Sequence, residues 1–421
     1  MGQKSAPPAF QANLFFAPYA TKSRPIRSEP ETVRTGPHHG GLQSYGLINI
    51  MLSAIAAAIS LCLVSLTALP LIKSGRWWIR VWDFPRQQLG VLLAGALVVQ
   101  LALWPDNAIE QIICVATMFA LAWHLWWIFP YTRLRKTQVK PASRGADPNQ
   151  RIRLLVANVY QFNRNIHGLF RNISIFSPDL VLVLEADDWW DRHLAALRHR
   201  YPQVVARPQQ NTYGMLLFSR LELMSVEVRE LVTKGVPSIK ALVKLRSGKI
   251  VELHCLHPEP PFIGSDAYER DAELLLVAKE TARSPHPTIV CGDMNDVAWS
   301  RTSRLFQRMS GLLDPRIGRG LYSTFDAKRW YARWPLDHIF HDRRFLLNQI
   351  QVGGRIGSDH FPIFVELIYQ PDATEAEETP ETADSEDYRE AAQKIQSGKE
   401  AAREAEQEPA TANVATVARL G

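Results

Sequence analysis

The sequence predicts an α/β domain, built of two packed β-sheets with helices outside and preceded by three transmembrane helices. Three long stretches without charged residues lie within the first 131 residues. From Arg151 to about Gln370, strand-like runs alternate with turns and helix-like segments, and short polar motifs directly follow several of the runs. Period-two alternation is typical of half-buried strands, and nearly continuous apolar runs are typical of central strands.

The length of the chain limits the size of its domain, and its charge indicates the kind of partner. At 421 residues the chain exceeds one compact domain, so we expect a core of roughly 200 to 250 residues with appendages. The net charge is +6, but the tail from Pro371 holds 13 acidic and 5 basic residues, which leaves +14 for residues 1–370. A phosphate-bearing partner is therefore plausible, although basic surfaces also serve solubility. The four cysteines have no disulfide-framework spacing and predict free thiols.

The three apolar stretches predict transmembrane helices at about residues 46–72, 87–105 and 110–131. The first stretch lies too far from the N-terminus for a cleaved signal sequence. The alternative is a buried helical bundle in a soluble protein, but little in this region is polar enough to cover such helices. Tryptophans, which favour membrane interfaces, fall near the proposed boundaries: Trp77, Trp78, Trp104, Trp126 and Trp127.

The basic residues that flank these stretches bear on orientation. Positive charges favour the cytoplasmic side of a membrane. They occur in the loop after the first stretch and in the segment after the third, which favours a cytoplasmic C-terminal domain: Lys73, Arg76, Arg80, Arg86, Arg133, Arg135, Lys136 and Lys140. The N-terminal segment opposes this orientation, because three spans would place its own basic residues outside: Lys22, Arg24, Arg27 and Arg34.

Composition divides the chain into five parts. Two of them, a polar N-terminal segment and an acidic low-complexity tail, are expected to be disordered, with a possible short helix from Glu386 to Glu406 in the tail. The five parts are 1–44, the N-terminal segment; 45–131, the transmembrane helices; 132–150, a polar linker; 151–370, the α/β domain; and 371–421, the tail.

Polar side chains follow the apolar runs of the α/β domain at the points where strands should end. The motifs are VANVYQFN, PDLVLVLEAD, HCLHPEPP, IVCGDMND, PLDHIFH and GSDHFPIF. Because strand ends of one sheet scaffold meet at a common rim, several carboxylates, amides and histidines should converge there. Hard oxygen ligands and histidines at one rim indicate a divalent cation and hydrolytic chemistry.

The ordered motifs GDMND, LDHIF and SDHFP resemble those of the endonuclease/exonuclease/phosphatase superfamily. The resemblance covers about Arg151 to Leu367 and implies the four-layered α/β sandwich of pancreatic deoxyribonuclease. VANVYQFNRN, HPEPP and NDVAWS look like variants of a bacterial-type subgroup with three N-terminal spans. This resemblance implies an integral, multi-pass protein of the bacterial inner (plasma) membrane.

Three residues are implied by the resemblance to hold a divalent cation, Mg²⁺ or Mn²⁺. Glu185 would be the principal ligand, with Asn158 helping to hold the metal and Asp359 contributing to metal or water coordination. The sequence around Glu185 is consistent with this role, because a carboxylate directly after the apolar run LVLVL is costly unless something compensates its charge. An ordinary exposed strand end is the alternative. Asn163 is a weaker candidate that could simply cap a turn.

Five further residues are implied to act on the phosphate. Asp293 would serve as base or orienter of the attacking water, and Asn295 would bind a phosphate oxygen. Their spacing of two places both side chains on one face of an extended segment, although an Asp-Asn turn is the alternative. Asp337 would fix the tautomer of His360, which stabilises the transition state. His257 would bind phosphate or assist the leaving group.

Three neighbours of these residues are expected to be bystanders, because alternation along the strands turns them away: His254, Asp296 and His338. Eleven basic residues between Arg301 and Arg355 either line a substrate groove or form a solvated face. Trp299, Trp330 and Trp334 either stack on a base or pack against the edge of the sheet.

The sequence therefore predicts a membrane-anchored, metal-dependent phosphoesterase, a hydrolase acting on ester bonds. The motifs recognise a phosphate and do not choose its carrier. The basic region favours a nucleic acid, and the membrane anchor favours a phospholipid headgroup. A different class remains as the alternative, namely an inactive membrane-bound binding or scaffold protein with the same fold. No specific protein partner is predicted.

Overall fold

The computed structural model describes residues 40–407, except 105–106, 144, 262–263 and 373–380. The expected disorder of residues 1–39 therefore falls outside the described residues. The chain forms two compact units, 1–48 and 49–421. Of the first unit, only the initial residues of one helix are described. Apart from the start of that helix, every element discussed below lies in the second unit.

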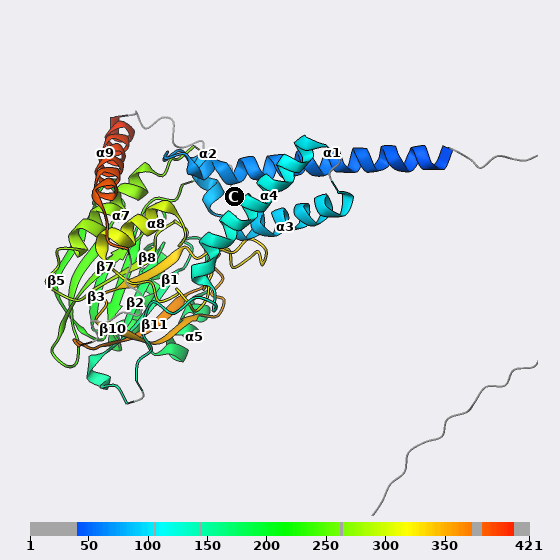
Figure 1. The fold of residues 1–421 in the computed structure, drawn as a ribbon. Coiled ribbons are helices and arrows are strands. Elements are labelled where there is room, and N and C mark those ends of the chain that lie inside the picture. Colours follow the sequence, from blue (N-terminus) through cyan, green and yellow to red (C-terminus); the bar gives the residue numbers. More distant parts are fainter. Residues whose placement is uncertain (1–39, 105–106, 144, 262–263, 373–380, 408–421) are drawn as a thin grey trace, which may run out of the picture. The chain divides into compact units, whose positions relative to one another are not determined.

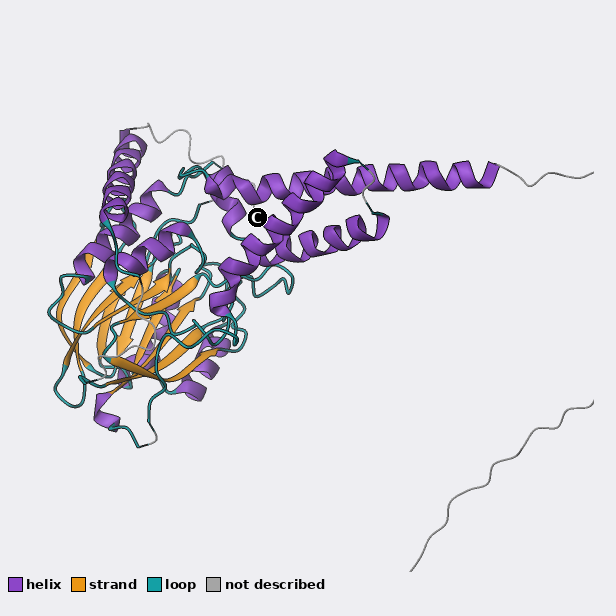
Figure 2. Ribbon diagram, viewed as in Figure 1, coloured by secondary structure: helices purple, strands orange, loops and turns teal. Residues whose placement is uncertain are grey.

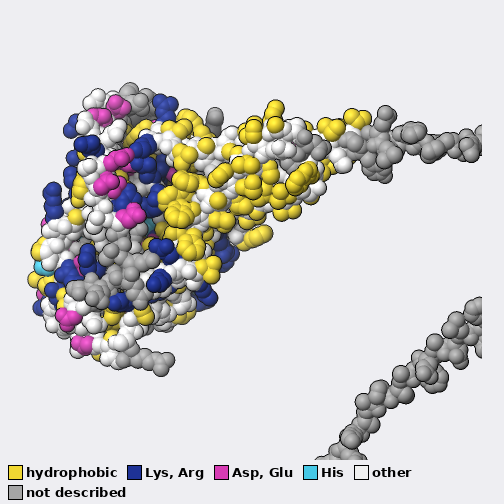
Figure 3. All heavy atoms as spheres, viewed as in Figure 1, with side chains coloured by type: hydrophobic (Ala, Val, Ile, Leu, Met, Phe, Trp, Pro, Cys, Tyr) yellow, Lys and Arg dark blue, Asp and Glu magenta, His cyan; other side chains and the backbone are white. Residues whose placement is uncertain are grey.

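In the part of the chain that the structure describes, three helices are long and apolar enough to cross a membrane. They are α1 (Gly40–Ala68), α3 (Arg86–Leu103) and α4 (Ala108–Ile128). The candidate spans are Leu47–Leu71, Arg86–Leu103 and Ala108–Tyr131, close to the predicted segments. Large apolar side chains remain exposed on all three helices, as the yellow surface in Figure 3 shows. Such a surface is costly in water and is satisfied by lipid.

Two β-sheets make up the domain that follows (Figures 1 and 2). The first has six strands in the order β10-β11-β1-β2-β4-β3, and the second has five in the order β5-β6-β7-β8-β9. Most neighbouring strands are antiparallel, but β1 and β2 are parallel, as are β7 and β8. The strands are β1 (Arg151–Asn158), β2 (Leu180–Leu184), β3 (Gln203–Arg207), β4 (Met215–Ser219), β5 (Glu222–Arg229), β6 (Ser238–Lys244), β7 (Ile250–Leu256), β8 (Thr288–Asp293), β9 (Asp337–His341), β10 (Phe345–Val352) and β11 (Ile363–Tyr369).

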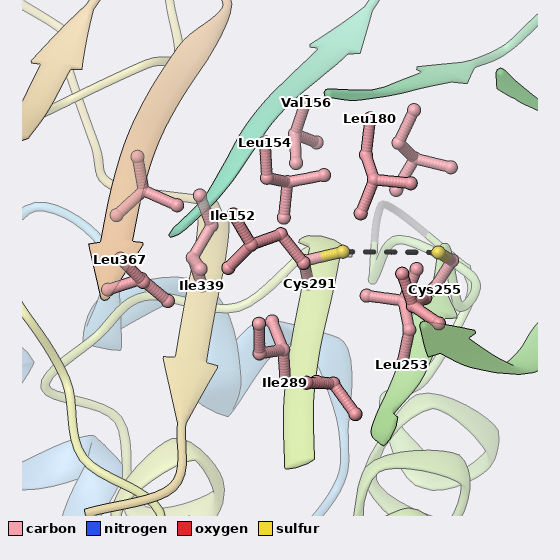
Figure 4. Close-up of a cluster of buried hydrophobic side chains, with 14 of the residues drawn as sticks. Ile152, Leu154, Val156, Leu180, Leu253, Cys255, Ile289, Cys291, Ile339 and Leu367 are labelled. Atoms are coloured by element: carbon pink, nitrogen blue, oxygen red, sulfur yellow. Dashed lines mark hydrogen bonds between the residues drawn. The ribbon is translucent and has the colours of Figure 1, made fainter. Parts of the chain in front are cut away.

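The sheets pack face to face, and helices cover both outer faces, which gives the four-layered sandwich that the resemblance implies. Leu154 and Val156 of β1 join side chains of the second sheet in the central core (Figure 4). Leu155 and Ala157, which alternate with them, pack under α5 and α6. Both faces of β1 are therefore buried, which explains its nearly continuous apolar sequence. The covering helices are α5 (Ile166–Phe176), α6 (Asp188–Leu194), α7 (Tyr268–Thr281) and α8 (Arg301–Ser310).

The cysteines of the domain lie in this core as free thiols. Cys255 and Cys291 are paired residues of the parallel strands β7 and β8. Their sulfur atoms are 3.9 Å apart and fully enclosed by aliphatic side chains (Figure 4). Buried cysteines of this kind behave as small apolar residues.

The connector between the first two spans packs against the domain. It contains the short helix α2 (Trp77–Arg80), followed by a 3₁₀ turn (Val81–Asp83). The indole Nε1 of Trp299 donates a hydrogen bond of 2.7 Å to the carbonyl oxygen of Asp83. Tyr131, at the end of the third span, donates from its hydroxyl to the carbonyl oxygen of Ala298 at 2.8 Å. The ends of the spans thus contact the segment directly after β8.

The predicted linker, residues 132–150, also contacts the domain. Ala142 donates its backbone N–H to the carbonyl oxygen of Leu347 in the edge strand β10. Val139 is buried in the central core, and the side-chain oxygen of Gln138 accepts from the backbone N–H of Asp314 at 2.7 Å. Part of this polar segment is therefore attached to the sandwich.

Part of the tail is a helix, at the place where the sequence allowed one. α9 (Ser385–Gln407) packs along α7 and buries a stripe of small and aliphatic residues: Ala391, Ile395, Gly398 and Ala402. Lys394 forms an ion pair of 2.6 Å with the buried Asp271 of α7. The expected disorder of residues 371–421 therefore does not hold over this helix, because its stripe has a partner surface. Residues 373–380 and 408–421 lie outside the described part of the chain.

Candidate active site

The strand ends of the two parallel pairs bring polar side chains to one rim of the sandwich. β1 ends at Asn158 and β8 at Asp293, while Glu185 and His257 are the first residues after β2 and β7. Asp337 opens β9 and pairs in register with Asp293. The convergence expected from the motifs is therefore present.

The backbone is strained at this rim. Glu185 has a φ of +57°, and Tyr160 and Asn295 have values of +58° and +49°. Residues with side chains rarely adopt this left-handed region, and such outliers concentrate at functional sites. All three residues lie within two positions of the end of β1, β2 or β8.

Asn158 connects two carboxylates. Its Nδ2 donates to Glu185 Oε1 at 2.8 Å and to Asp293 Oδ2 at 3.1 Å. Its Oδ1 accepts from the backbone N–H of Tyr160 at 3.0 Å, which fixes the orientation of the amide. Asn158 therefore positions Glu185 from one sheet and Asp293 from the other.

Glu185 is a carboxylate in a site that disfavours its charge. Burial raises its pKa to about 7, and the nearby charges of Asp359 and Asp293 act in the same direction. Its Oε2 accepts a long bond of 3.3 Å from the backbone N–H of Gln161. Among the described residues no lysine or arginine forms an ion pair with Glu185. A bound cation would relieve this cost.

These groups fit a hard divalent cation. The donors that face the site are carboxylate oxygens, the ligands that Mg²⁺ and Mn²⁺ prefer. Asp359 lies within electrostatic range of Glu185, and its Oδ1 accepts from the Ser358 hydroxyl at 3.2 Å. Asp293, Asp337 and His360 form a second group of possible ligands, with one ligand atom of each within 4.8 Å of the others.

His360 lies between two carboxylates. Its Nδ1 is 2.8 Å from Asp337 Oδ2, and its Nε2 is 3.4 Å from Asp293 Oδ2. Although burial disfavours a charged imidazole, the two carboxylates raise the pKa of His360 to about 10. His360 therefore carries a proton at neutral pH. Burial alone would raise the pKa of Asp293, but His360 and then His257 hold it below the ordinary value.

His257 differs from His360 in charge. Burial lowers its pKa to about 4, so the ring is neutral at neutral pH. Its Nδ1 is buried and makes no hydrogen bond within the described part of the chain. The ring of Tyr213 lies 5.7 Å from the imidazole, centre to centre. A neutral ring with an unpartnered nitrogen can bind a ligand oxygen without bringing a second cation into the site.

Asn295 departs from the extended geometry that its spacing suggested. Its backbone N–H donates to Asp293 Oδ1 at 3.0 Å, so the two residues form an Asx turn. Its Nδ2 donates to the carbonyl oxygen of Pro258 at 2.9 Å. The turn that was the alternative is therefore present, and it ties the loop of β8 to the loop that carries His257.

The expected bystanders point away from the site and have partners of their own. His254 Nε2 lies 2.8 Å from Glu252. His338 accepts at Nδ1 from Arg316 and donates from Nε2 to the carbonyl oxygen of Asp296, both at 2.8 Å. Asp296 Oδ2 accepts from the hydroxyls of Ser300 and Ser303. These partners explain why all three positions carry polar residues without facing the rim.

Asn163 also has structural partners. Its Nδ2 donates to the carbonyl oxygens of Val159 and Ile356, each at 3.0 Å. Its Oδ1 accepts from the backbone N–H of Asn165. These bonds tie the chain after β1 to the segment before His360, which matches the alternative of a turn cap.

Six of the eleven basic residues serve the fold, among them Arg319 and Arg344, which bind the carbonyl oxygen of Val139 and the carboxylate of Asp342. Arg301 and Arg308 form ion pairs with acidic residues of α9, and Arg316 is buried against Asp314. Arg304 stacks over Trp127, with its guanidinium carbon 3.5 Å from the ring centre. Four basic residues lie in the segments beside the rim: Lys328, Arg329, Arg333 and Arg355. Of the three tryptophans, Trp299 is buried, Trp334 is half-buried and Trp330 is exposed.

Three residues at the site were not singled out from the sequence. Tyr213 faces His257, and Gln161 binds Glu185 through its backbone. Arg270 of α7 donates from Nη1 to the carbonyl oxygen of Asn295 at 2.7 Å. Tyr213 lies just before the apolar strand β4, and Gln161 lies inside the motif VANVYQFN without being distinguished there by its type. No motif contains Arg270.

Comparison with known families gives one match. The profile described as Endonuclease/Exonuclease/phosphatase family matches residues 144–360, about half of the chain. This range contains each of the candidate site residues. No curated protein matches the sequence.

Solved structures similar to this chain include proteins from several organisms. D. rerio TDP2 complexed with single strand DNA product is 17% identical, with a TM-score of 0.44, over 52% of this chain and 98% of that chain. The human Nocturnin catalytic domain is 16% identical, with a TM-score of 0.44, over 57% and 99%. An endonuclease/exonuclease/phosphatase from Bacteroides vulgatus is 16% identical, with a TM-score of 0.44, over 52% and 99%.

Proposed function

Because the chain belongs to the endonuclease/exonuclease/phosphatase family, we propose that it is a membrane-anchored phosphoesterase that depends on a divalent metal. One observation supports this best. The carboxylate of Asp293 lies between Asn158 and His360 at the meeting point of the two sheets. This arrangement gives a buried carboxylate that stays charged beside a buried imidazolium, which suits attack by water on a phosphate ester.

Asp293 is proposed to orient the attacking water and to accept its proton. Its carboxylate is held ionised by the neighbouring His360, and Asn158 and the backbone of Asn295 each bind one of its oxygens. These bonds fix the carboxylate, so that a water molecule bound to it has a defined direction.

His360 is proposed to stabilise the charge that develops on the phosphate. Asp337 accepts from its Nδ1, which leaves Nε2–H facing the site. A protonated imidazole aimed at a developing negative charge lowers the barrier without rearrangement. The neutral His257 and the amide of Asn295 are proposed to bind phosphate oxygens or the leaving group.

Glu185 and Asp359, with Asn158 holding Glu185 in place, are proposed to bind Mg²⁺ or Mn²⁺. The raised pKa of Glu185 and its lack of a basic partner among the described residues support this assignment. When bound, the cation supplies positive charge that neutralises the phosphate oxygens.

The three apolar helices support membrane anchoring. We propose that the protein lies in the inner membrane of a bacterium with its catalytic domain in the cytoplasm, as the basic connector favours. A reporter fused after Gln370 measures the side directly. Reporter activity outside the cytoplasm would contradict this orientation.

The catalytic proposal is tested with the full chain purified in detergent. Hydrolysis of p-nitrophenyl phosphate and bis-p-nitrophenyl phosphate is measured with Mg²⁺, Mn²⁺ or EDTA. We expect activity that EDTA abolishes and that Asp293→Ala lowers by about 10²- to 10⁴-fold. Glu185→Gln should raise the metal concentration needed for half-maximal rate.

Glu222→Gln is the matched control, because Glu222 is an exposed carboxylate on β5 that pairs with Lys244. Its rate should equal that of the unchanged chain. If Asp293→Ala retains full activity, or the unchanged chain hydrolyses neither ester, the alternative of an inactive binding protein gains the support.

A further inference from the structure

An apolar groove of about 440 Å³ lies beside the candidate active site. One side is formed by five residues of the connector between the first two spans, within Trp77–Pro85, and the other by Pro261 and Trp334 of the domain. Its volume falls within the range of about 300 to 1,000 Å³ that is usual for small-molecule sites. Its lining is almost entirely aromatic and aliphatic.

The groove and the catalytic rim share a wall. The ring of Trp334 stacks on Phe325, with centres 5.9 Å apart, and Phe325 lies 4.9 Å from the imidazole of His360. Pro261 belongs to the loop that begins at His257. The stacked rings of Phe325 and Trp334 therefore separate the groove from His360. A molecule with its phosphate at His360 and its apolar tail in the groove would extend across this one pair of rings.

The groove lies at the membrane boundary by topology. The first span ends and the second begins at the two ends of the connector, and the third span ends at Tyr131. These three points share the side of the membrane on which the domain follows. The groove is thus next to the apolar surface of the spans, which Figure 3 shows in yellow.

The loop between the groove and the rim has the composition of a membrane-interface segment. Trp330 and Tyr331 are 82% and 60% exposed, and both ring types favour the headgroup level of a bilayer. Gln88, in the first turn of the second span, donates to the carbonyl oxygen of Tyr331 at 2.8 Å. Lys328 and Arg333 add positive charge suited to phosphate groups.

We propose that the substrate is a membrane phospholipid, or another lipid phosphate ester, whose acyl chain occupies this groove while its phosphate enters the active site. This inference rests on the proposed phosphoesterase function. A lipid fits better than a nucleic acid, because the groove offers no charge for a sugar-phosphate backbone. The fold also holds four of the basic residues that could have lined a nucleic-acid channel, in ion pairs or stacked on a ring: Arg301, Arg304, Arg308 and Arg316.

The probes are n-alkyl phosphonates, which carry a phosphate-like head that cannot be hydrolysed. Methyl, butyl, hexyl, octyl and decyl phosphonate are tested below their micelle concentrations as inhibitors of whichever p-nitrophenyl ester the amphipol-stabilised full chain hydrolyses. Each methylene buried from water should tighten binding about 3- to 4-fold. The inhibition constant should therefore fall steadily from butyl to decyl phosphonate.

The groove is isolated with two matched variants, because long chains also adsorb to the apolar surface of the spans. Val81→Glu introduces a charge into the groove at a position that is 45% exposed. Val226→Glu makes the same change at a 40% exposed position on β5. We expect Val81→Glu to abolish the dependence on chain length while leaving inhibition by methyl phosphonate unchanged, and Val226→Glu to preserve the dependence.

The same dependence on chain length in all three proteins would overturn the proposal. Inhibition by a single-stranded oligonucleotide that is tighter than inhibition by decyl phosphonate would overturn it in favour of a nucleic acid. If the unchanged chain hydrolyses neither ester, the proposed function fails separately. Quenching of tryptophan fluorescence by a bromo-decyl phosphonate, compared between the unchanged chain and Val81→Glu, then still decides whether the groove binds an alkyl chain.

Discussion

At the scale of single residues, one buried imidazole faces two buried carboxylates. Asp337 accepts from Nδ1 of His360, and Asp293 lies on the Nε2 side. The other oxygen of Asp337, Oδ1, has no hydrogen-bond partner within the described part of the chain. Asp337 therefore has one evident task, which is to hold the proton and the orientation of His360.

Replacing Asp337 with Asn should separate this task from stability. The side chain keeps its shape, but its N–H can donate to Nδ1 of His360, so that Nδ1 loses its proton and the ring is neutral instead of an imidazolium. We expect the rate of ester hydrolysis to fall by roughly 10²- to 10⁴-fold, with the thermal unfolding midpoint little changed. Asp191→Asn, in an exposed pair with Arg198, should keep full activity. A fully active Asp337→Asn would show that His360 needs no orienting carboxylate.

At the scale of elements, the connector between the first two spans is attached to the catalytic loop through buried charge. Arg80 of α2 pairs with Asp83 at 2.7 Å and lies 4.0 Å from Asp296, the residue after Asn295. All three side chains are buried. The pair at Asp83 is extended by Arg86, the first residue of the second span.

Breaking this network should destabilise the domain and disturb the site together. Arg80→Met removes the guanidinium and leaves the buried carboxylates of Asp83 and Asp296 without its positive charge. We expect this to lower the unfolding free energy by about 3 to 5 kcal/mol. Hydrolysis should also slow, because Asp296 helps to fix the loop of Asn295. Arg76→Met is the control, since Arg76 is an exposed residue of the same connector. Thermal unfolding and ester hydrolysis in detergent give both readouts, and equal midpoints for the two variants would contradict the argument.

The strands and helices differ in how clearly the sequence predicts them. β1, β2 and β8 are buried on both faces, and their continuous apolar runs identify them. The strands β3, β5 and β10 are partly exposed, and each lies at an edge of a sheet, where exposure dilutes the apolar pattern. The buried stripe of α9 consists largely of alanine and glycine, so its docking on α7 depends on close approach. A Cβ on Gly398 would lie 2.4 Å from the carbonyl oxygen of Tyr268.

The candidate site could be predicted where a polar residue ends or directly follows a buried strand, because burying such a group requires a function or a partner. Asn158, Glu185 and Asp293 are of this kind. The sequence left a turn at Asn295 as one of two alternatives, because the hydrogen bond from its Nδ2 to the carbonyl oxygen of Pro258 joins residues that are distant in the sequence. The contact of Tyr213 with His257 likewise depends on how the loops of the two sheets meet.

At the scale of the whole molecule, several histidines are buried in the neutral form. His341 at the end of β9 is fully buried, donates from Nδ1 to the carbonyl oxygen of Asp342 at 2.9 Å and packs edge-on against Phe345. Burial lowers its pKa to about 4. His338 is held in the same state, with its pKa lowered to about 3 by burial and then by Arg316. Acid should therefore weaken the domain.

The direction of the pKa shift determines how the unfolding free energy changes with pH. A histidine whose pKa is lower in the folded state binds its proton first in the unfolded state, so its stabilising contribution is complete above the unfolded value of about 6.5. That contribution is lost as the pH falls toward the folded value near 4. Between pH 7 and pH 5, His341 alone should remove about 2 kcal/mol of unfolding free energy.

We expect His341→Phe, which keeps an aromatic ring but cannot bind a proton, to reduce the difference in unfolding free energy between pH 7 and pH 5 by that amount. Chemical denaturation of the full chain in detergent, followed by tryptophan fluorescence at both pH values, measures the difference. His199→Phe, at an exposed position, should leave it unchanged, and an equal difference in His341→Phe and the unchanged chain would mean that His341 does not limit stability in acid.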